Sequence, residues 1–312
     1  MMQASSDKLK KMNGLRGLLA LEIVIGHSIR YSGGILFPFG KFMICGVALF
    51  FFVSAWGLVL SYSSKPNYLD MHYFLSKPVY LFLVAVSIYA ISVAIDFVLP
   101  QDLGFVASLG SLYGFFVYTN WYIWYQILFY LLFWFTYRYL YRWRVAIIAI
   151  VTVVLVIAAY AMGWADSWML TQFAFPAGIV FAENYERASE FVASWRGKAL
   201  IVVLVGFGLG ALFLPMEGFV ATVLMRNSIC LGAVMIMLYI CEIGWLINNP
   251  VSRFLKKYSL EIYVSQFVWL FYIENINPGY WTRVGIMLAG TGLTAFVVHW
   301  PIVVIRRLVK KL

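Results

Sequence analysis

The chain has 312 residues, of which 63% are hydrophobic and only 12% are charged. This composition is far more apolar than that of a soluble globular domain, so it excludes water as the main solvent of the folded chain. The formal net charge of +10 is typical of basic cytoplasmic loops that contact anionic lipid, and we expect a lipid bilayer and no nucleic acid as partner.

Apolar runs of about twenty residues recur along the whole chain, each long enough to cross a bilayer as a helix. They lack the alternation of barrel strands, so helices are the expected spanning elements. The sequence predicts an all-α integral membrane protein, with 1–312 as a single membrane-embedded domain. About ten transmembrane helices are expected near 14–31, 42–62, 78–99, 121–141, 144–163, 169–182, 196–214, 219–246, 258–274 and 282–306.

The stretch 100–120 is apolar but is interrupted by Gly104, Gly110, Gly114 and two serines. An irregular backbone at membrane depth is tolerated where protein or a water-filled cavity surrounds it. The stretch is therefore either a re-entrant segment that forms a wall of a site or a surface loop, and both interpretations stay open.

The basic residues test this helix count, because cytoplasmic loops collect Lys and Arg. With ten helices and the N-terminus inside, eighteen of the 23 basic residues fall on the inner side and four on the outer side. We therefore expect both termini in the cytoplasm. The first apolar run is long and lacks a small-residue cleavage site, so we expect an uncleaved first helix. The expected location is multi-pass in the inner membrane of a bacterial cell.

The first apolar helix carries Arg16 and His27, eleven residues apart. At 100° per residue this spacing puts both side chains on one face, separated by roughly 16 Å of rise. Histidine carries protons near neutral pH, and a fixed cation at the inner mouth suits an anionic cytosolic substrate. A neutral imidazole that donates to a backbone carbonyl of a neighbouring helix is the structural alternative for His27.

Other polar residues lie within or near the apolar runs. Gln126 needs a neighbouring helix or a substrate as partner, whereas Arg226 faces either an external acceptor or the membrane interface. Glu261 is a further buried candidate, His299 lies near a span end where hydration explains it, and Glu22 has no assigned role.

The three cysteines, Cys45, Cys230 and Cys241, all lie inside apolar runs. Their spacing is unlike that of metal ligands, so we expect small buried core residues and no metal.

Four segments resemble helix patterns of the acyltransferase-3 family of multi-pass membrane O-acyltransferases. They are Asn-Gly-Leu-Arg-Gly-Leu at 13–18 with His27, Phe-Phe-Phe-Val-Ser-Ala-Trp-Gly-Leu-Val-Leu at 50–60, Trp-Tyr-Ile-Trp-Tyr-Gln-Ile-Leu-Phe-Tyr at 121–130, and Ser-Leu-Glu-Ile-Tyr at 259–263. The resemblance implies a ten-helix domain that takes an acyl group, commonly acetyl, from acyl-CoA in the cytosol. It would place this group on a hydroxyl of a surface polysaccharide or lipid-linked oligosaccharide.

The same resemblance implies roles for individual residues. His27 would be the catalytic base or acyl relay, and Arg16 would organise the CoA end of the donor. The remaining expected substrate-binding residues are Lys77 at the inner face together with Trp121, Gln126, Arg226, Ser259, Tyr263 and Gln266.

The chain departs from the family pattern at several positions, and at two of them an amide replaces a titratable group: the family usually has Glu where Gln126 stands and His where Gln266 stands. Amides bind substrates by hydrogen bonds but do not exchange protons. A non-catalytic relative that carries or senses a substrate is therefore an alternative to the acyltransferase, and a structural subunit of a glycan-export complex is a third interpretation. Acceptor identity, acyl length and oligomeric state are not readable from hydropathy.

Overall fold

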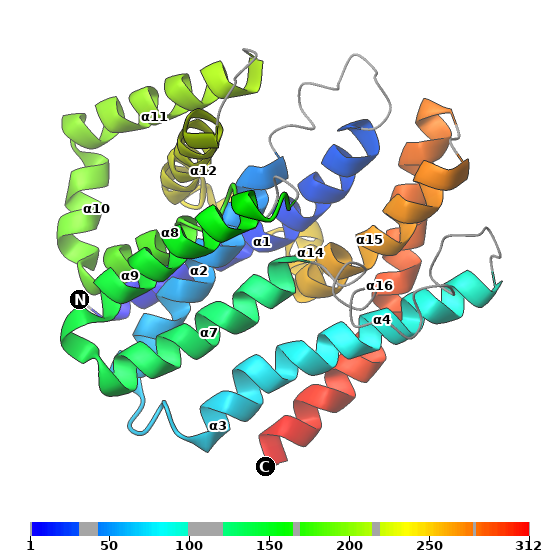
Figure 1. Ribbon diagram of the computed structural model, residues 1–312, viewed down its shortest axis with the longest axis horizontal. Coiled ribbons are helices and arrows are strands. Elements are labelled where there is room, and N and C mark those ends of the chain that lie inside the picture. The colour runs from blue at the N-terminus through cyan, green and yellow to red at the C-terminus, as the bar shows by residue number, and fades with distance from the viewer. Residues whose placement is uncertain are drawn as a thin grey trace. The chain divides into compact units, whose positions relative to one another are not determined.

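A computed structural model of the chain describes residues 2–30, 43–98, 121–164, 169–213, 219–276 and 279–311. Every regular element in these ranges is a helix, as Figure 1 shows, and the all-α prediction is confirmed. The stretch 100–120, predicted to be re-entrant or a loop, lies outside the described residues.

Each of the ten predicted apolar segments overlaps a helix. In chain order the helices are α1 (Met2–Arg30), α2 (Met43–Ser64), α3 (Met71–Phe74), the π-helical turn η2 (Leu75–Val79), α4 (Tyr80–Val98), α7 (Trp121–Tyr139), the 3-10 turn η3 (Tyr141–Trp143), α8 (Arg144–Ala161), α9 (Ala174–Glu183), α10 (Tyr185–Ala193), α11 (Trp195–Phe213), α12 (Phe219–Ile240), α13 (Gly244–Asn248), α14 (Pro250–Lys257), α15 (Ser259–Ile276) and α16 (Tyr280–Lys311).

Five helical segments among the described residues are long and apolar enough to cross a membrane, namely Met43–Ser64, Met71–Ile91, Tyr141–Ala161, Val223–Ile240 and Tyr280–Ile305. The pair α10 and α11 would be a sixth span, although it is bent by 77° at the break between the two helices. The chain is thus a protein with several membrane-length helices. The count of ten spans and the cytoplasmic position of both termini stay predictions.

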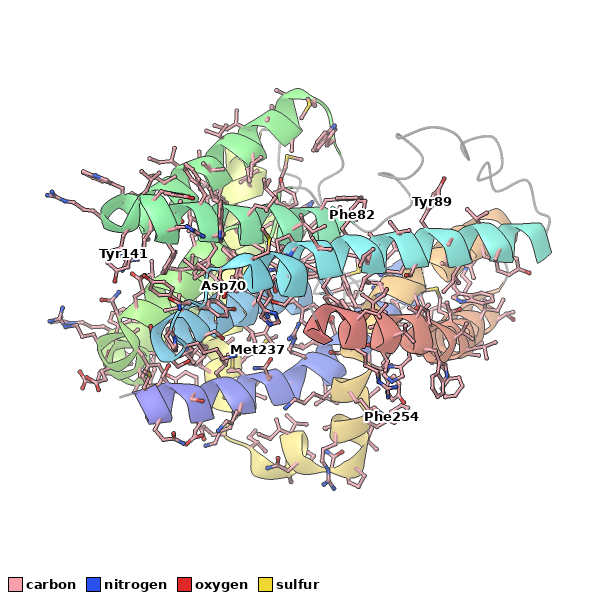
Figure 2. All side chains as sticks on the ribbon, turned by 90° about the horizontal axis from the view of Figure 1, so that it is seen from below. Asp70, Phe82, Tyr89, Tyr141, Met237 and Phe254 are labelled. Atoms are coloured by element: carbon pink, nitrogen blue, oxygen red, sulfur yellow. The ribbon has the colours of Figure 1, made fainter. Side chains whose placement is uncertain are left out.

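Large apolar side chains cover the outer surfaces of these helices. Phe82 on α4, which Figure 2 labels, is 46% exposed, and Val202 on α11 is 71% exposed. Apolar surface of this extent is unfavourable in water, whereas lipid tails solvate it without cost.

The described chain divides into two compact units that alternate along the sequence. The first unit comprises Met1–Arg16, Ile44–Tyr68 and Leu132–Lys256, and the second comprises Gly17–Met43, Leu69–Leu131 and Lys257–Leu312. Both α1 and α7 therefore contribute to each unit. The prediction of a single domain stays a prediction.

The core of the first unit forms around Trp56 on α2. Its ring packs against Phe181 of α9, with ring centres 4.8 Å apart, and its indole N–H donates to the hydroxyl of Ser5 at 3.0 Å. A Cβ atom at Gly178 would lie 2.4 Å from the backbone oxygen of Phe52. Glycine at this position therefore allows α9 to approach the backbone of α2.

In the second unit, α15 packs along α16. A Cβ atom at Gly290 would lie 2.3 Å from the indole of Trp269, and that indole donates a hydrogen bond of 2.8 Å to Thr294. The helix that leads to α4 widens at η2, which contains Pro78. Proline lacks the N–H that a regular turn requires, which accounts for the wider turn at this point.

Candidate functional site

Three helices of the second unit bring predicted site residues together. His27 lies near the end of α1, and Gln126 lies in the second turn of α7. Tyr263 and Gln266 lie about one turn apart on α15. The ring of Tyr122, one turn before Gln126, lies edge-on to Tyr263 with centres 5.1 Å apart.

His27 is held by the side-chain amide of Gln266. The imidazole Nδ1 lies 3.0 Å from Oε1 of Gln266, and Nε2 of the same amide donates to the backbone carbonyl of Tyr263 at 2.9 Å. A backbone carbonyl can only accept, so it directs the amide nitrogen toward itself and the amide oxygen toward His27. The imidazole must then donate from Nδ1, and in the neutral ring Nε2 carries the lone pair that accepts protons.

Aromatic rings enclose this pair. Phe267 lies edge-on to the His27 imidazole, with ring centres 5.6 Å apart. The ring centres of Phe267 and Tyr263 are 6.3 Å apart. Both Gln266 and Tyr263 are buried. Burial away from water strengthens the hydrogen bond that orients the imidazole and restricts its rotation.

Gln126 is 1% exposed, and neither its amide oxygen nor its amide nitrogen has a hydrogen-bond partner among the described residues. The hydroxyl of Ser265 and one carboxylate oxygen of Glu22, both in the second unit, are also buried without a hydrogen-bond partner among the described residues. An unpartnered buried amide costs about 1–3 kcal/mol of stability, so its retention points to a ligand or an ordered water. Its N–H₂ group can donate to a developing negative charge.

Arg16 lies in the first unit, on the earlier part of α1. Its guanidinium group lies 5.3 Å from the centre of the Phe50 ring and contacts the side-chain oxygen of Asn13 at 3.4 Å. Its Nε atom is buried and has no hydrogen-bond partner among the described residues. Asn13, Arg16 and Phe50 all belong to the segments that resemble the family pattern, and they meet here in space.

The other predicted residues occupy separate places. Trp121 is the first residue of α7, Ser259 is the first residue of α15, and Lys77 is partly buried in η2. Arg226 lies on α12 in the first unit beside Asn227, whose amide donates to the backbone oxygen of Met169 at 3.0 Å. Their substrate-binding roles stay predictions.

One feature that the sequence interpretation missed is the pairing of buried Glu261, near the start of α15, with the partly buried His299. Glu261 accepts a hydrogen bond of 3.0 Å from Nδ1 of His299 on α16, and Tyr258 lies against the imidazole with ring centres 4.7 Å apart. The sequence analysis assigned His299 to a hydrated position because it lies near a predicted span end. The two residues are 38 positions apart in the chain, so the sequence gives no local sign of their pairing.

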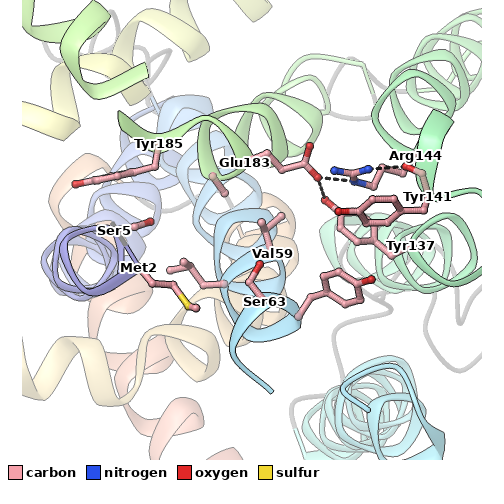
Figure 3. Close-up of a pocket in the computed structure, with 12 residues that line it drawn as sticks. Met2, Ser5, Val59, Ser63, Tyr137, Tyr141, Arg144, Glu183 and Tyr185 are labelled. Atoms are coloured by element: carbon pink, nitrogen blue, oxygen red, sulfur yellow. Dashed lines mark hydrogen bonds and ion pairs between the residues drawn. The ribbon is translucent and has the colours of Figure 1, made fainter. Parts of the chain in front are cut away.

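A second missed feature is a cavity of about 370 Å³ in the first unit, shown in Figure 3. We call it the tyrosine cavity; it is lined by Met2, Ser5, Val59, Leu60, Tyr62, Ser63, Tyr137, Tyr141, Arg144, Ala182, Glu183 and Tyr185. In the sequence analysis, Arg144 is only one of the eighteen basic residues assigned to the inner side. None of the predicted site residues lines this cavity.

The three cysteines are buried and free, as predicted for core residues. Within the described ranges, no group of three His, Cys, Asp or Glu side chains could hold a metal ion.

Several membrane-length helices define a multi-pass membrane protein, and one of its buried amides orients an imidazole. The family model described as an acyltransferase domain matches residues 9–305, which is nearly the whole chain. The chain therefore belongs to the acyltransferase-3 family, as the four sequence segments predicted. No curated protein and no solved structure matches it.

Proposed function

We propose that this protein is an O-acyltransferase that moves an acyl group, acetyl in the leading case, from cytosolic acyl-CoA to a hydroxyl of a surface polysaccharide or lipid-linked glycan. The observation that carries the proposal is the imidazole of His27, oriented through Nδ1 by Gln266, in a chain of the acyltransferase-3 family. The proposed location is the inner membrane of a bacterial cell.

In the proposed reaction, Nε2 of His27 takes the proton of the acceptor hydroxyl. The hydroxyl oxygen attacks the thioester carbonyl, the C–S bond breaks, and the imidazolium returns the proton to the departing CoA thiolate. Donation from Nδ1 to Gln266 supports this role because it leaves Nε2 as the basic nitrogen and stabilises the imidazolium that forms.

The tetrahedral intermediate places negative charge on the former carbonyl oxygen. Gln126 is suited to stabilise that charge, because its buried amide has hydrogen-bonding groups without partners in the described residues and is already desolvated. Arg16, at the expected inner mouth of the first helix, would attract the phosphates of CoA. Lys77 is proposed as a second basic residue that binds the donor.

The test uses the purified chain in lipid nanodiscs with radiolabelled acetyl-CoA and cell-wall glycan as acceptor. We expect label on the glycan with the native chain and a loss of at least about a hundredfold in His27→Ala, the scale of general acid–base catalysis. Arg16→Ala should raise the KM for acetyl-CoA. The matched control is His72→Ala, because His72 is exposed at the start of α3. Native transfer rates in His27→Ala would overturn the assigned role.

The second candidate function is a carrier or sensor, which the amides at positions 126 and 266 favour because amides do not exchange protons. Such a protein would bind its ligand without consuming the CoA thioester. A structural subunit of a glycan-export complex would instead tolerate replacement of both Arg16 and His27 without any effect on glycan acylation.

A further inference from the structure

The tyrosine cavity is formed where helix ends of the first unit meet. The start of α1, the end of α2, the junction of α7 with α8 and the junction of α9 with α10 all contribute to it (Figure 3). In the predicted topology each of these ends lies on the cytoplasmic side, so a ligand of this cavity would come from the cytosol.

One wall of the cavity combines aromatic rings with a buried ion pair. Nε of Arg144 donates to Glu183 at 2.6 Å, Tyr137 donates its hydroxyl to the same carboxylate oxygen at 2.5 Å, and the guanidinium carbon lies 3.7 Å from the centre of the Tyr141 ring. Both charged side chains are only 17% exposed. They are thus held in place before any ligand arrives.

This ion pair has unused hydrogen-bonding capacity. Arg144 also donates from Nη1 to the backbone oxygen of Tyr141 at 2.5 Å. Its Nη2 and the second carboxylate oxygen of Glu183 make no further hydrogen bond to the described residues. The wall therefore offers a donor and an acceptor next to each other, beside flat aromatic rings.

We propose that the tyrosine cavity binds the adenine base of the acyl-CoA donor, an inference that rests on the proposed function. The amino group of adenine can donate to the carboxylate of Glu183 while a ring nitrogen accepts from Arg144, and the base gains stacking energy from tyrosine rings. A volume of about 370 Å³ accommodates a nucleoside but is too small for a whole acyl-CoA molecule. The pantetheine arm must therefore lie outside the cavity.

Exposed basic residues follow the lining residues closely in the chain, namely Lys65 after Ser63, Arg138 after Tyr137 and Arg142 after Tyr141. Their positive charges make this part of the first unit basic, and basic surroundings favour a ligand whose ribose carries phosphates, as that of CoA does. A neutral sugar could also stack on tyrosine, but it would gain nothing from these charges.

The test fills the cavity without disturbing the ion pair. Ser63 lines the cavity and is exposed at the end of α2, whereas its neighbour Ser64 is exposed but does not line it. We expect Ser63→Trp to weaken the binding of adenosine 3′,5′-bisphosphate to the full-length chain in nanodiscs by about tenfold. Ser64→Trp should bind like the native chain. Tyr141→Leu, at an exposed ring, provides a second variant should Ser63→Trp fail to fold.

Two acyl donors separate this inference from the proposed function. With acetyl-CoA, Ser63→Trp should raise KM by a similar factor and leave kcat unchanged. With S-acetylpantetheine, which lacks the nucleotide, native chain and variant should transfer equally well. Transfer from neither donor, combined with nucleotide binding that depends on position 63, would remove the proposed function and still support base binding by the cavity.

The inference is overturned if the native chain does not bind adenosine 3′,5′-bisphosphate, or if both Ser63→Trp and Tyr141→Leu bind it with native affinity. An equal loss of transfer from acetyl-CoA and S-acetylpantetheine in these variants would also overturn it. Such a loss would mean that the variants disturb the binding of the acyl group or of the acceptor and not that of the nucleotide.

Discussion

Gln266 stands where the family pattern has histidine, yet its amide orients His27 through one hydrogen bond and is itself anchored by the carbonyl of Tyr263. A positioning role predicts that Gln266→Leu, which keeps the volume but removes the acceptor, lowers kcat by about a hundredfold with little change in KM. The pH profile of kcat should shift as well, because the imidazole would no longer donate from Nδ1.

Gln266→Glu is the matched variant, because a carboxylate still accepts from the Nδ1 of His27. It should recover part of the lost kcat. A Gln266→Leu enzyme with native kcat and a native pH profile would show that the hydrogen bond is structural only.

Gln126 provides a second test at the residue scale, through the cost of its unpartnered amide. Gln126→Leu should raise the free energy of unfolding by about 1 kcal/mol and reduce acyl transfer at the same time. Thermal unfolding in nanodiscs and the transfer assay measure the two effects on the same samples.

The control for Gln126 is Thr291→Val on α16, where a buried hydroxyl also has no hydrogen-bond partner among the described residues. This variant should gain stability without losing transfer. If Gln126→Leu keeps full activity, its amide has no part in the reaction.

At the scale of the helix, the contact between α11 and α12 depends on small residues. A Cβ atom at Gly208 would lie 2.2 Å from the Cβ of Ile229, whereas a Cβ at Gly206 would meet nothing within 4 Å. Gly208→Ala should therefore destabilise the fold by about 1–3 kcal/mol, because the two helix backbones must separate.

Gly206→Ala is the matched control on the same helix, and it should be neutral or stabilising because alanine favours the helix. Thermal unfolding midpoints of the two variants give the comparison. Equal midpoints would mean that α11 and α12 are not in close contact.

The helix positions follow from hydropathy, but several ends do not. The segment predicted at 219–246 is divided, since α12 ends at Ile240 and α13 begins at Gly244. Between them Glu242 binds Lys8 at 2.5 Å and also pairs with Lys11. An ion pair with residues more than 230 positions away in the chain cannot be predicted from local hydropathy.

At the scale of the whole molecule, the cluster of Lys8, Lys11 and Glu242 connects the start of α1 to the end of α12 within the first unit. Hydrogen bonds from Lys11 and Lys8 hold the pKa of Glu242 below its ordinary value of 4.5. The cluster therefore contributes stability above that value, and the contribution is lost as the pH falls through the lower pKa of the folded state.

Glu242→Gln should lower the free energy of unfolding at pH 7 by about 0.2–1 kcal/mol, a small effect because the carboxylate is half-exposed and salt screens it. The difference from the native chain should shrink as the pH falls below 4.5. Unfolding midpoints from pH 3 to pH 7 give the comparison, with Glu186→Gln, an exposed glutamate on α10, as the control. A difference that is independent of pH would exclude the ion pair as its cause.

The sequence by itself determined the solvent of this protein, its all-helical class and its family. Apolar runs of membrane length leave helices as the spanning elements, because backbone groups in lipid must be paired within the segment. Three motif residues, His27, Arg16 and Gln126, could also be identified from the sequence, because each is a polar side chain within a run where apolar ones are expected.

Only the tertiary structure decided which polar groups meet. Gln266 was visible as an amide, but its contact with the imidazole of His27 joins residues 239 positions apart. The pairing of Arg144 with Glu183 and the cavity around them likewise depend on how helix ends converge. Hydropathy records the preference of each segment for lipid, whereas side-chain pairing depends on helix rotation and crossing, which are decided by packing between helices distant in the chain.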